Sequence, residues 1–207
     1  MITGILLAAG KGKRFGGDKL LCPLADGVPL AVAAARRLVS VLPQSLAVVR
    51  ADAAELARRL AAEGMAVVVN PQAEQGMGMS LACGVAAAAR AEGWVISLGD
   101  MPFIQPATIR GIVDLLETGV AIVAPVYRGR RGHPVGFQGV FGEQLAGLNG
   151  DRGAQELLQR HAERLYCWPV DDPGVLLDID TRDDLVWQEQ AREAGGVGHN
   201  SAPYCTL

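Results

Sequence analysis

TGILLAAGKGKRFGGDK, residues 3–19, joins a short apolar run to a loop rich in glycine and basic residues. Residues 3–7 have the length of a buried strand, and the loop begins where that strand would end. Open α/β sheets bind ligands at this edge. Glycines at positions 10, 12, 16 and 17 allow tight turns, and their backbone N–H groups can surround an anion. Lys11, Lys13, Arg14 and Lys19 add four positive charges within nine residues, which suits a triphosphate.

Two other phosphate-binding motifs do not fit this loop. The Walker A pattern requires Gly-Lys followed by Ser or Thr, and the chain has no such triplet. The dinucleotide pattern GxGxxG matches at Gly10 and Gly12, but Phe15 stands at its third glycine position. A Rossmann-type oxidoreductase is therefore an alternative that the misplaced glycine disfavours. A flexible surface loop with solvated lysines is disfavoured by its position after a buried strand.

The rest of the chain alternates apolar runs of strand length with helical patterns. Runs at 46–49, 65–69, 94–98 and 121–126 predict strands, and 30–42, 53–63, 78–90 and 106–117 predict helices. Continuous apolar runs indicate strands that are buried on both faces, as in a parallel sheet covered by helices. We therefore predict a three-layer α/β/α sandwich with a doubly wound, mostly parallel, Rossmann-like sheet.

The pattern changes after residue 126. A turn at 128–132, a strand at 133–138 and a helix at 153–160 follow, and we expect this region to cover the open edge of the sheet. A last helix should begin at Thr181, whose hydroxyl can cap it while Asp184 completes a capping box, and run to about residue 194. Residues 1–194 are expected to form one domain, and 195–207 a disordered tail.

Composition and charge narrow the functional class. Half of the 207 residues are hydrophobic, and the net charge of −3 argues against a nucleic-acid binder with a general basic face. The four cysteines form no CxxC pair, so the chain has neither a zinc motif nor a disulfide framework. We see no signal-peptide pattern and no apolar run long enough to span a membrane, and we expect a soluble, cytoplasmic protein.

Two further segments supply carboxylates. Asp100, in Gly-Asp-Met-Pro, follows the strand at 94–98, so it should face the same crevice as the glycine loop. A carboxylate there suits Mg²⁺, although an Asp after a strand is by itself more often a turn former. Asp178 and Asp180, in LDIDTRDD at 177–184, would share one face if this segment is a strand. An acidic helix N-terminus is the alternative for them.

These motifs together resemble the MobA-like nucleotidyltransferases, over roughly residues 3–190. LAAGxGxRFGGxK is similar to the family signature that binds the triphosphate, and Gly-Asp-Met-Pro is similar to its metal-binding motif. The resemblance implies that Arg14, Lys19 and Asp100 are catalytic and that Asp100 and Asp180 hold Mg²⁺. It implies nucleotide contacts from Leu7, Ala8, Ala9, Gly10, Gly12, Lys13, Arg14, Lys19 and Asp100.

The branch that this chain most resembles is the molybdenum cofactor cytidylyltransferases. Ala9, in Leu-Ala-Ala-Gly, favours CTP, because the guanylyltransferase branch usually has Leu-Ala-Gly-Gly. The implied reaction is attack by the phosphate of a molybdopterin-type acceptor on the α-phosphorus of CTP, with release of pyrophosphate. The alternatives are a guanylyltransferase, a sugar- or alcohol-phosphate nucleotidyltransferase, and a non-catalytic maturation factor that binds a nucleotide and serves a molybdoenzyme. A recipient molybdoenzyme or its chaperone is the implied protein partner.

Three more segments are similar to substrate-contacting parts of the family. NPQAEQGMGMS at 70–80 implies nucleotide contacts from Gly76 and Ser80, although Ser80 could equally cap a helix and Met77 by default only packs. GHPVGF at 132–137 is similar to a family segment near the acceptor, which implies that the pterin ring lies by His133 and that the pterin phosphate suits Arg130 and Arg131. His133 is disfavoured as a catalytic base, because a phosphate nucleophile is already ionised. The similarity of GDRGA at 150–154 to another family loop implies a contribution to the acceptor site.

Overall fold

The computed structural model describes residues 1–10, 12, 15, 17–181 and 184. Eight strands form one sheet in the order β3-β2-β1-β4-β7-β5-β6, with β8 paired to β5. Neighbouring strands run parallel in the half formed by β1–β4 and again between β5 and β8, whereas β6 and β7 are antiparallel to their neighbours. The strands are β1 (Ile2–Ala8), β2 (Ser45–Arg50), β3 (Ala66–Asn70), β4 (Gly93–Leu98), β5 (Ile122–Tyr127), β6 (Arg130–Arg131), β7 (Val135–Gln138) and β8 (Leu165–Pro169).

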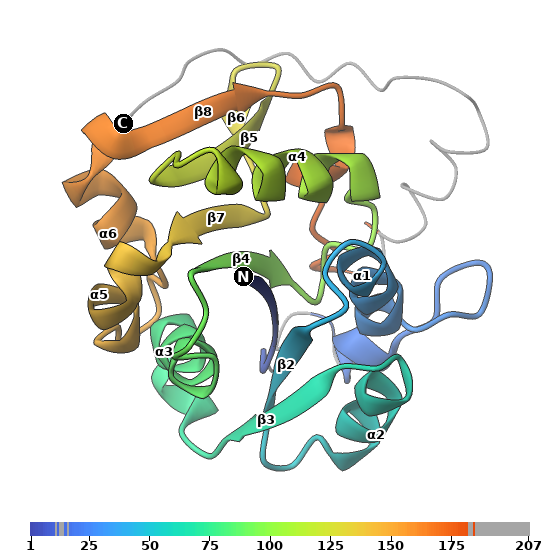
Figure 1. Ribbon diagram of the computed structural model, residues 1–207. Helices are drawn as coiled ribbons and strands as arrows, with labels where there is room; N and C mark the ends of the chain where they lie inside the picture. Colours follow the sequence, from blue (N-terminus) through green and yellow to red (C-terminus); the bar gives the residue numbers. More distant parts are fainter. Residues whose placement is uncertain (11, 13–14, 16, 182–183, 185–207) are drawn as a thin grey trace.

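Helices cover both faces of this sheet and complete the predicted three layers (Figure 1). One face carries α1 (Leu30–Val39), α2 (Ala54–Ala62) and α4 (Pro106–Glu117), and the other carries α3 (Met77–Ala87), α5 (Gly142–Ala146) and α6 (Gln155–Arg160). Successive residues of β1 point to opposite faces, so that Leu6 belongs to the core with Leu38 of α1, and Ile5 to the core with Leu81 of α3. Burial on both faces explains why the parallel strands are continuous apolar runs.

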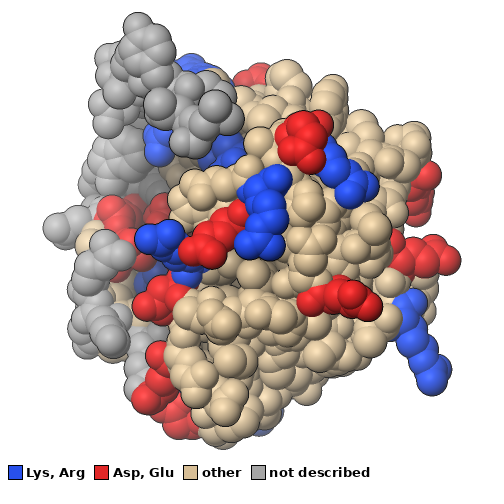
Figure 2. All heavy atoms as spheres, turned by 90° about the vertical axis from the view of Figure 1, so that its left-hand side faces the viewer, with Lys and Arg blue, Asp and Glu red and all other residues tan. Residues whose placement is uncertain are grey.

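Short 3₁₀ segments link these elements: η1 (Lys19–Leu21), η2 (Ala73–Gln75), η3 (Gly139–Phe141), η4 (Ala162–Arg164) and η5 (Pro173–Leu176). None of the helices in the described ranges has both the length and the apolar character needed to cross a bilayer. On the face shown in Figure 2, acidic and basic side chains are interspersed rather than gathered by sign.

The region after residue 126 adds strands and covers the open edge of the sheet, as predicted. The strand predicted at 133–138 is β7, which does not form that edge but lies inside the sheet between β4 and β5. Gly136 allows this insertion, because a Cβ atom there would lie 2.7 Å from Ile112 and 2.8 Å from Val123. The edge is instead formed by β8, which the sequence analysis did not predict and which has mostly exposed or half-buried residues. Its sequence, Leu-Tyr-Cys-Trp-Pro, lacks the run of aliphatic residues from which the other parallel strands were predicted.

The predicted start of the last helix is confirmed by its capping box. The Thr181 hydroxyl accepts a hydrogen bond from the Asp184 backbone N–H at 3.2 Å, and the Asp184 carboxylate accepts from the Thr181 N–H at 2.7 Å. The course of this helix to residue 194 and the predicted tail at 195–207 lie outside the described residues.

Candidate active site

The site lies at the carboxyl ends of β1 and β4, which are adjacent strands of the sheet. The turn after β4 is tied to β1, because the Gly99 backbone N–H donates to the Leu7 carbonyl at 2.9 Å. Parallel strands end at one edge of the sheet, so this pairing brings the glycine loop and Asp100 together. A cleft of about 460 Å³ lies there.

Most of the predicted nucleotide-binding residues line this cleft: Leu7, Ala9, Gly10, Gly12, Lys19, Gly76, Ser80 and Asp100. Ala8 does not, because its side chain points into the core on the other face of β1. Lys13 and Arg14 lie outside the described residues. The cleft is also lined by Met77, for which packing was the default interpretation, and by residues that the sequence analysis did not assign to it: Leu20, Ala73, Glu74, Leu98 and Asp151.

A lysine and two aspartates form the charged centre of the site. The Lys19 Nζ atom lies 2.9 Å from Asp100 Oδ2 and 2.9 Å from Asp180 Oδ1. The Lys19 side chain is 9% exposed, whereas those of Asp100 and Asp180 are 25% and 32% exposed. Burial favours the neutral amine, but the hydrogen bonds and negative charges of the two aspartates outweigh it and raise the pKa of Lys19. Lys19 is therefore a firmly held ammonium group.

Local backbone contacts place these three residues. Gly12 has a φ of +56°, and a Cβ atom there would lie 2.8 Å from Lys19 Cβ, so the glycine lets the loop fold onto the lysine. The Ile179 N–H donates to the Asp100 carbonyl at 3.0 Å, which holds Asp180 beside β4. Residues 177–180 form no strand in the structure, and Asp178 is more exposed than Asp180. Asp178 and Asp180 were expected to share one face only if this segment was a strand, so that expectation does not apply.

Asp100 keeps one carboxylate oxygen for a further ligand. Its Oδ1 atom is buried and has no hydrogen-bond partner among the residues that the structure describes. A buried oxygen without a donor is costly unless a ligand satisfies it. Carboxylate oxygens are the ligands that Mg²⁺ prefers, so Asp100 and Asp180 fit a divalent cation in this corner of the cleft.

His133 lies close to Asp100. Its backbone N–H donates to the Val175 carbonyl at 2.9 Å, and a cis peptide bond joins it to Pro134. Burial lowers the pKa of His133 to about 4; Asp100 and the Ile96 backbone raise it, and Arg131 lowers it further. The imidazole is therefore neutral at pH 7. Arg130 lies in β6 and is exposed, so the structure leaves it open to a ligand in solution.

The other wall of the cleft is the start of α3. Gly76 is its N-cap residue, with a φ of +114°, so Ser80 does not cap the helix. The Ser80 hydroxyl instead accepts a hydrogen bond from the Asn70 amide at 3.1 Å. The 149–151 loop packs against this turn: the Gly78 N–H donates to the Gly150 carbonyl at 2.8 Å. This contact brings Asp151 into the cleft, where the loop had been expected to serve the acceptor site.

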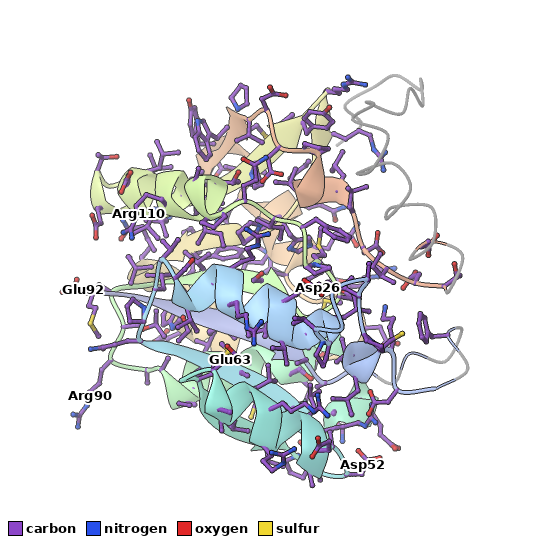
Figure 3. All side chains as sticks on the ribbon, turned by 90° about the vertical axis from the view of Figure 1, so that its right-hand side faces the viewer. Asp26, Asp52, Glu63, Arg90, Glu92 and Arg110 are labelled. Atoms are coloured by element: carbon purple, nitrogen blue, oxygen red, sulfur yellow. The ribbon has the colours of Figure 1, made fainter. Side chains whose placement is uncertain are left out.

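Arg50 holds the glycine loop that lines the cleft, a role that the sequence analysis missed. It ends β2, and its guanidinium donates to the Gly10 carbonyl at 3.0 Å and lies 3.5 Å from Asp18. A third bond, at 2.6 Å, joins it to Asp52, which follows β2 (Figure 3). Arg50 therefore links the two ends of the glycine loop. Arg50 could have been found from the sequence, because it is a charged residue directly after the predicted apolar strand at 46–49, whose end faces the predicted site.

Comparisons with known proteins agree with this architecture. Residues 4–165 match the family described as the MobA-like NTP transferase domain. A nicotine blue oxidoreductase of Paenarthrobacter nicotinovorans is 30% identical over 193 residues, which are 89% of this chain and 94% of the relative. A molybdenum cofactor guanylyltransferase of Cupriavidus metallidurans is 32% identical over 206 residues, 94% of this chain and 97% of the relative. A Mycobacterium tuberculosis protein, solved in complex with manganese, is 30% identical with a TM-score of 0.74, over 92% of this chain and 98% of that one.

Proposed function

The chain belongs to the MobA-like NTP transferase family and is a nucleotidyltransferase, and from this premise we propose that it transfers CMP from CTP to molybdopterin or a related phosphorylated acceptor. The observation that carries the proposal is the contact of Lys19 with Asp100 and Asp180 beside a glycine-rich loop. This arrangement offers charge of both signs to a triphosphate and its metal. We place the reaction in the cytoplasm, where widely spaced cysteines stay reduced.

We propose Mg²⁺ as the cofactor, held by Asp100 and Asp180. The Asp100 Oδ1 atom supports this assignment, because it has no hydrogen-bond partner in the described part of the chain, and so does the manganese bound by the Mycobacterium tuberculosis protein. When bound, Mg²⁺ supplies Lewis-acid polarisation of the α-phosphate and offsets the charge that builds up on pyrophosphate.

The residues of the chain contribute position and charge rather than a nucleophile. The backbone N–H groups of the glycine loop and Lys19 bind the triphosphate, and the Gly76 turn receives the nucleoside. Arg130 holds the acceptor phosphate, and neutral His133 lies by the pterin ring. The acceptor phosphate is already ionised, so its attack needs no base. Arg14 completes the proposed charge stabilisation from the part of the loop outside the described residues.

Ala9 is the basis for proposing CTP. It lines the cleft, in the position where guanylyltransferases of the family usually have glycine. The relative from Cupriavidus metallidurans is named a guanylyltransferase, which makes GTP the second candidate.

A second candidate activity is an oxidoreductase, because the relative from Paenarthrobacter nicotinovorans has that name. Two structural features disfavour a dinucleotide cofactor. Phe15, at the third glycine position, is buried against Leu30 and Ile179. Arg50, at the end of β2 where such folds contact the ribose, is held by Gly10 and two aspartates.

The test is pyrophosphate release from CTP, GTP, ATP and UTP, with Mg²⁺ and with or without molybdopterin. We expect release from CTP only, dependent on the acceptor, and a loss of at least about 100-fold in Asp100→Asn. Exposed Asp171→Asn is the matched control. Release of pyrophosphate from GTP instead would show that the protein is a guanylyltransferase. Binding of CTP without release would favour a maturation factor, and acceptor-independent oxidation of NADPH would favour the oxidoreductase.

A further inference from the structure

The Lys19 ammonium contacts both of the aspartates that are proposed to hold the divalent cation. Its Nζ atom is 2.9 Å from one oxygen of each carboxylate. An ammonium group has three donors, and the two aspartates use two of them. Lys19 thus neutralises the pair of carboxylates.

Lys19 and a metal ion cannot use this position together. A cation bound by Asp100 Oδ2 and Asp180 Oδ1 would lie within a few ångströms of the ammonium, and two positive charges at such a distance repel strongly in a poorly solvated site. The Lys19 side chain is nearly buried, so water screens this repulsion weakly. A metal ion that takes these two oxygens must therefore displace the ammonium.

We propose that Lys19 acts as a resident cation that holds the metal site closed until a nucleoside triphosphate draws its ammonium away. The proposal rests on the function proposed above, because it takes Asp100 and Asp180 as the metal ligands. Nucleotide and metal then bind cooperatively: the triphosphate takes Lys19, and the metal takes the two carboxylate oxygens that Lys19 has left. Free metal alone has to displace an ion-paired lysine and binds weakly.

The surroundings allow this exchange. Lys19 has a flexible four-carbon stem, and the cleft into which it can extend is lined by Gly10 and Gly12. None of the described residues donates to the Asp100 Oδ1 atom, so an arriving cation gains a first ligand there without breaking a hydrogen bond to them. The ammonium can then transfer from Asp100 and Asp180 to the phosphate oxygens.

The experiment measures Mn²⁺ affinity by electron paramagnetic resonance, with the full chain and with a non-hydrolysable CTP analogue present or absent. We expect Lys19→Met, without nucleotide, to bind Mn²⁺ at least about 10-fold more tightly than the wild type, because the competing charge is gone. The analogue should tighten Mn²⁺ binding by the wild type at least about 10-fold and by Lys19→Met much less. Arg90→Met, at the opposite end of the strands, is the matched control (Figure 3).

A second readout needs no variant. All three lysines of the chain lie at positions 11, 13 and 19, so amine acylation followed by peptide mapping can report on Lys19 alone. Saturating Mn²⁺ without nucleotide should increase the acylation rate of Lys19 several-fold, because the displaced amine loses both ion pairs. An unchanged acylation rate would contradict the proposal that the metal ion displaces Lys19 from the two aspartates.

Asp100→Asn distinguishes a failure of the proposed metal site from a failure of the proposed Lys19 exchange. The same variant also measures how much Mn²⁺ is bound by the nucleotide alone. If Asp100→Asn weakens Mn²⁺ binding but Lys19→Met does not strengthen it, the metal site stands and the exchange is wrong. If neither Asp100→Asn nor Asp180→Asn changes Mn²⁺ affinity, the metal site of the proposed function is wrong, and the exchange falls with it.

Discussion

Replacement of Asp172 by alanine should destabilise the protein and loosen the metal site. Asp172 is 2% exposed. It accepts hydrogen bonds from the Gln105 N–H at 2.9 Å, the Thr108 hydroxyl at 2.7 Å and the Gly174 N–H at 2.9 Å. These bonds join the first turn of α4 to η5, and the chain then leads to Asp180. Asp172 therefore fixes the segment that carries the second proposed metal ligand.

The expected loss of stability in Asp172→Ala follows from these three hydrogen bonds. A hydrogen bond to a charged acceptor contributes about 1.5–3 kcal/mol, but the three are not additive, because water or relaxation replaces part of the loss. We expect a loss of about 3 kcal/mol in the free energy of unfolding, which for a chain of this size lowers Tm by about 6–12 °C. Asp172→Asn keeps one acceptor oxygen but turns an N–H group toward a donor, so it should lose about 1–2 kcal/mol.

The assay is urea and thermal unfolding of Asp172→Ala, Asp172→Asn and the exposed neighbour Asp171→Ala, followed by Mn²⁺ titration. We expect Asp171→Ala to lie within about 0.5 kcal/mol of the wild type. Mn²⁺ affinity should fall in Asp172→Ala and stay unchanged in Asp171→Ala. Equal stability of the two alanine variants would refute the view that Asp172 holds this segment.

Three further predictions concern the walls of the site. In Gly78→Ala the new Cβ atom would lie 2.5 Å from the Asn149 carbonyl oxygen, so the 149–151 loop must move; stability should fall by about 1–3 kcal/mol and the KM for nucleotide should rise. Arg50→Met removes the donor to the Gly10 carbonyl and should raise the KM for nucleotide by about 10-fold or more, with a small change in Tm. His133 titrates at about 4 in the folded protein and near 6.5 when unfolded, so its contribution to stability is complete above pH 6.5 and is lost as the pH falls toward 4. Urea unfolding should show a loss of at most about 3 kcal/mol over that window, and His133→Gln should flatten it.

Each of these predictions has a control. Gly147→Ala places its Cβ at an ordinary 3.4 Å from the nearest atom on an exposed turn, and should leave both stability and KM unchanged. Arg90→Met removes an arginine far from the cleft, so a matching rise in KM there would exclude a specific role for Arg50. If His161→Gln, rather than His133→Gln, flattened the pH profile, the burial argument for His133 would be wrong.

The layered fold could be predicted because its signals are local. Each central strand is buried on both faces, which requires a continuous apolar run, and the helix at 106–117 has the predicted bounds. The glycine loop and Asp100 could be placed in one crevice, because parallel strands end at the same edge. Even the capping box at Thr181 depends on residues only three apart.

The centre of the site depends instead on contacts between segments that are distant in the chain. Lys19 meets Asp100 and Asp180 across 81 and 161 residues, and nothing in the spacing of these residues indicates that one ammonium would bridge both. Tertiary packing likewise decides the position of β7 inside the sheet and the contact of Gly78 with the 149–151 loop. Other packings of the same elements would be compatible with the same local sequence patterns. Local patterns specify which face of an element is buried; only the packing of those faces specifies which charges meet.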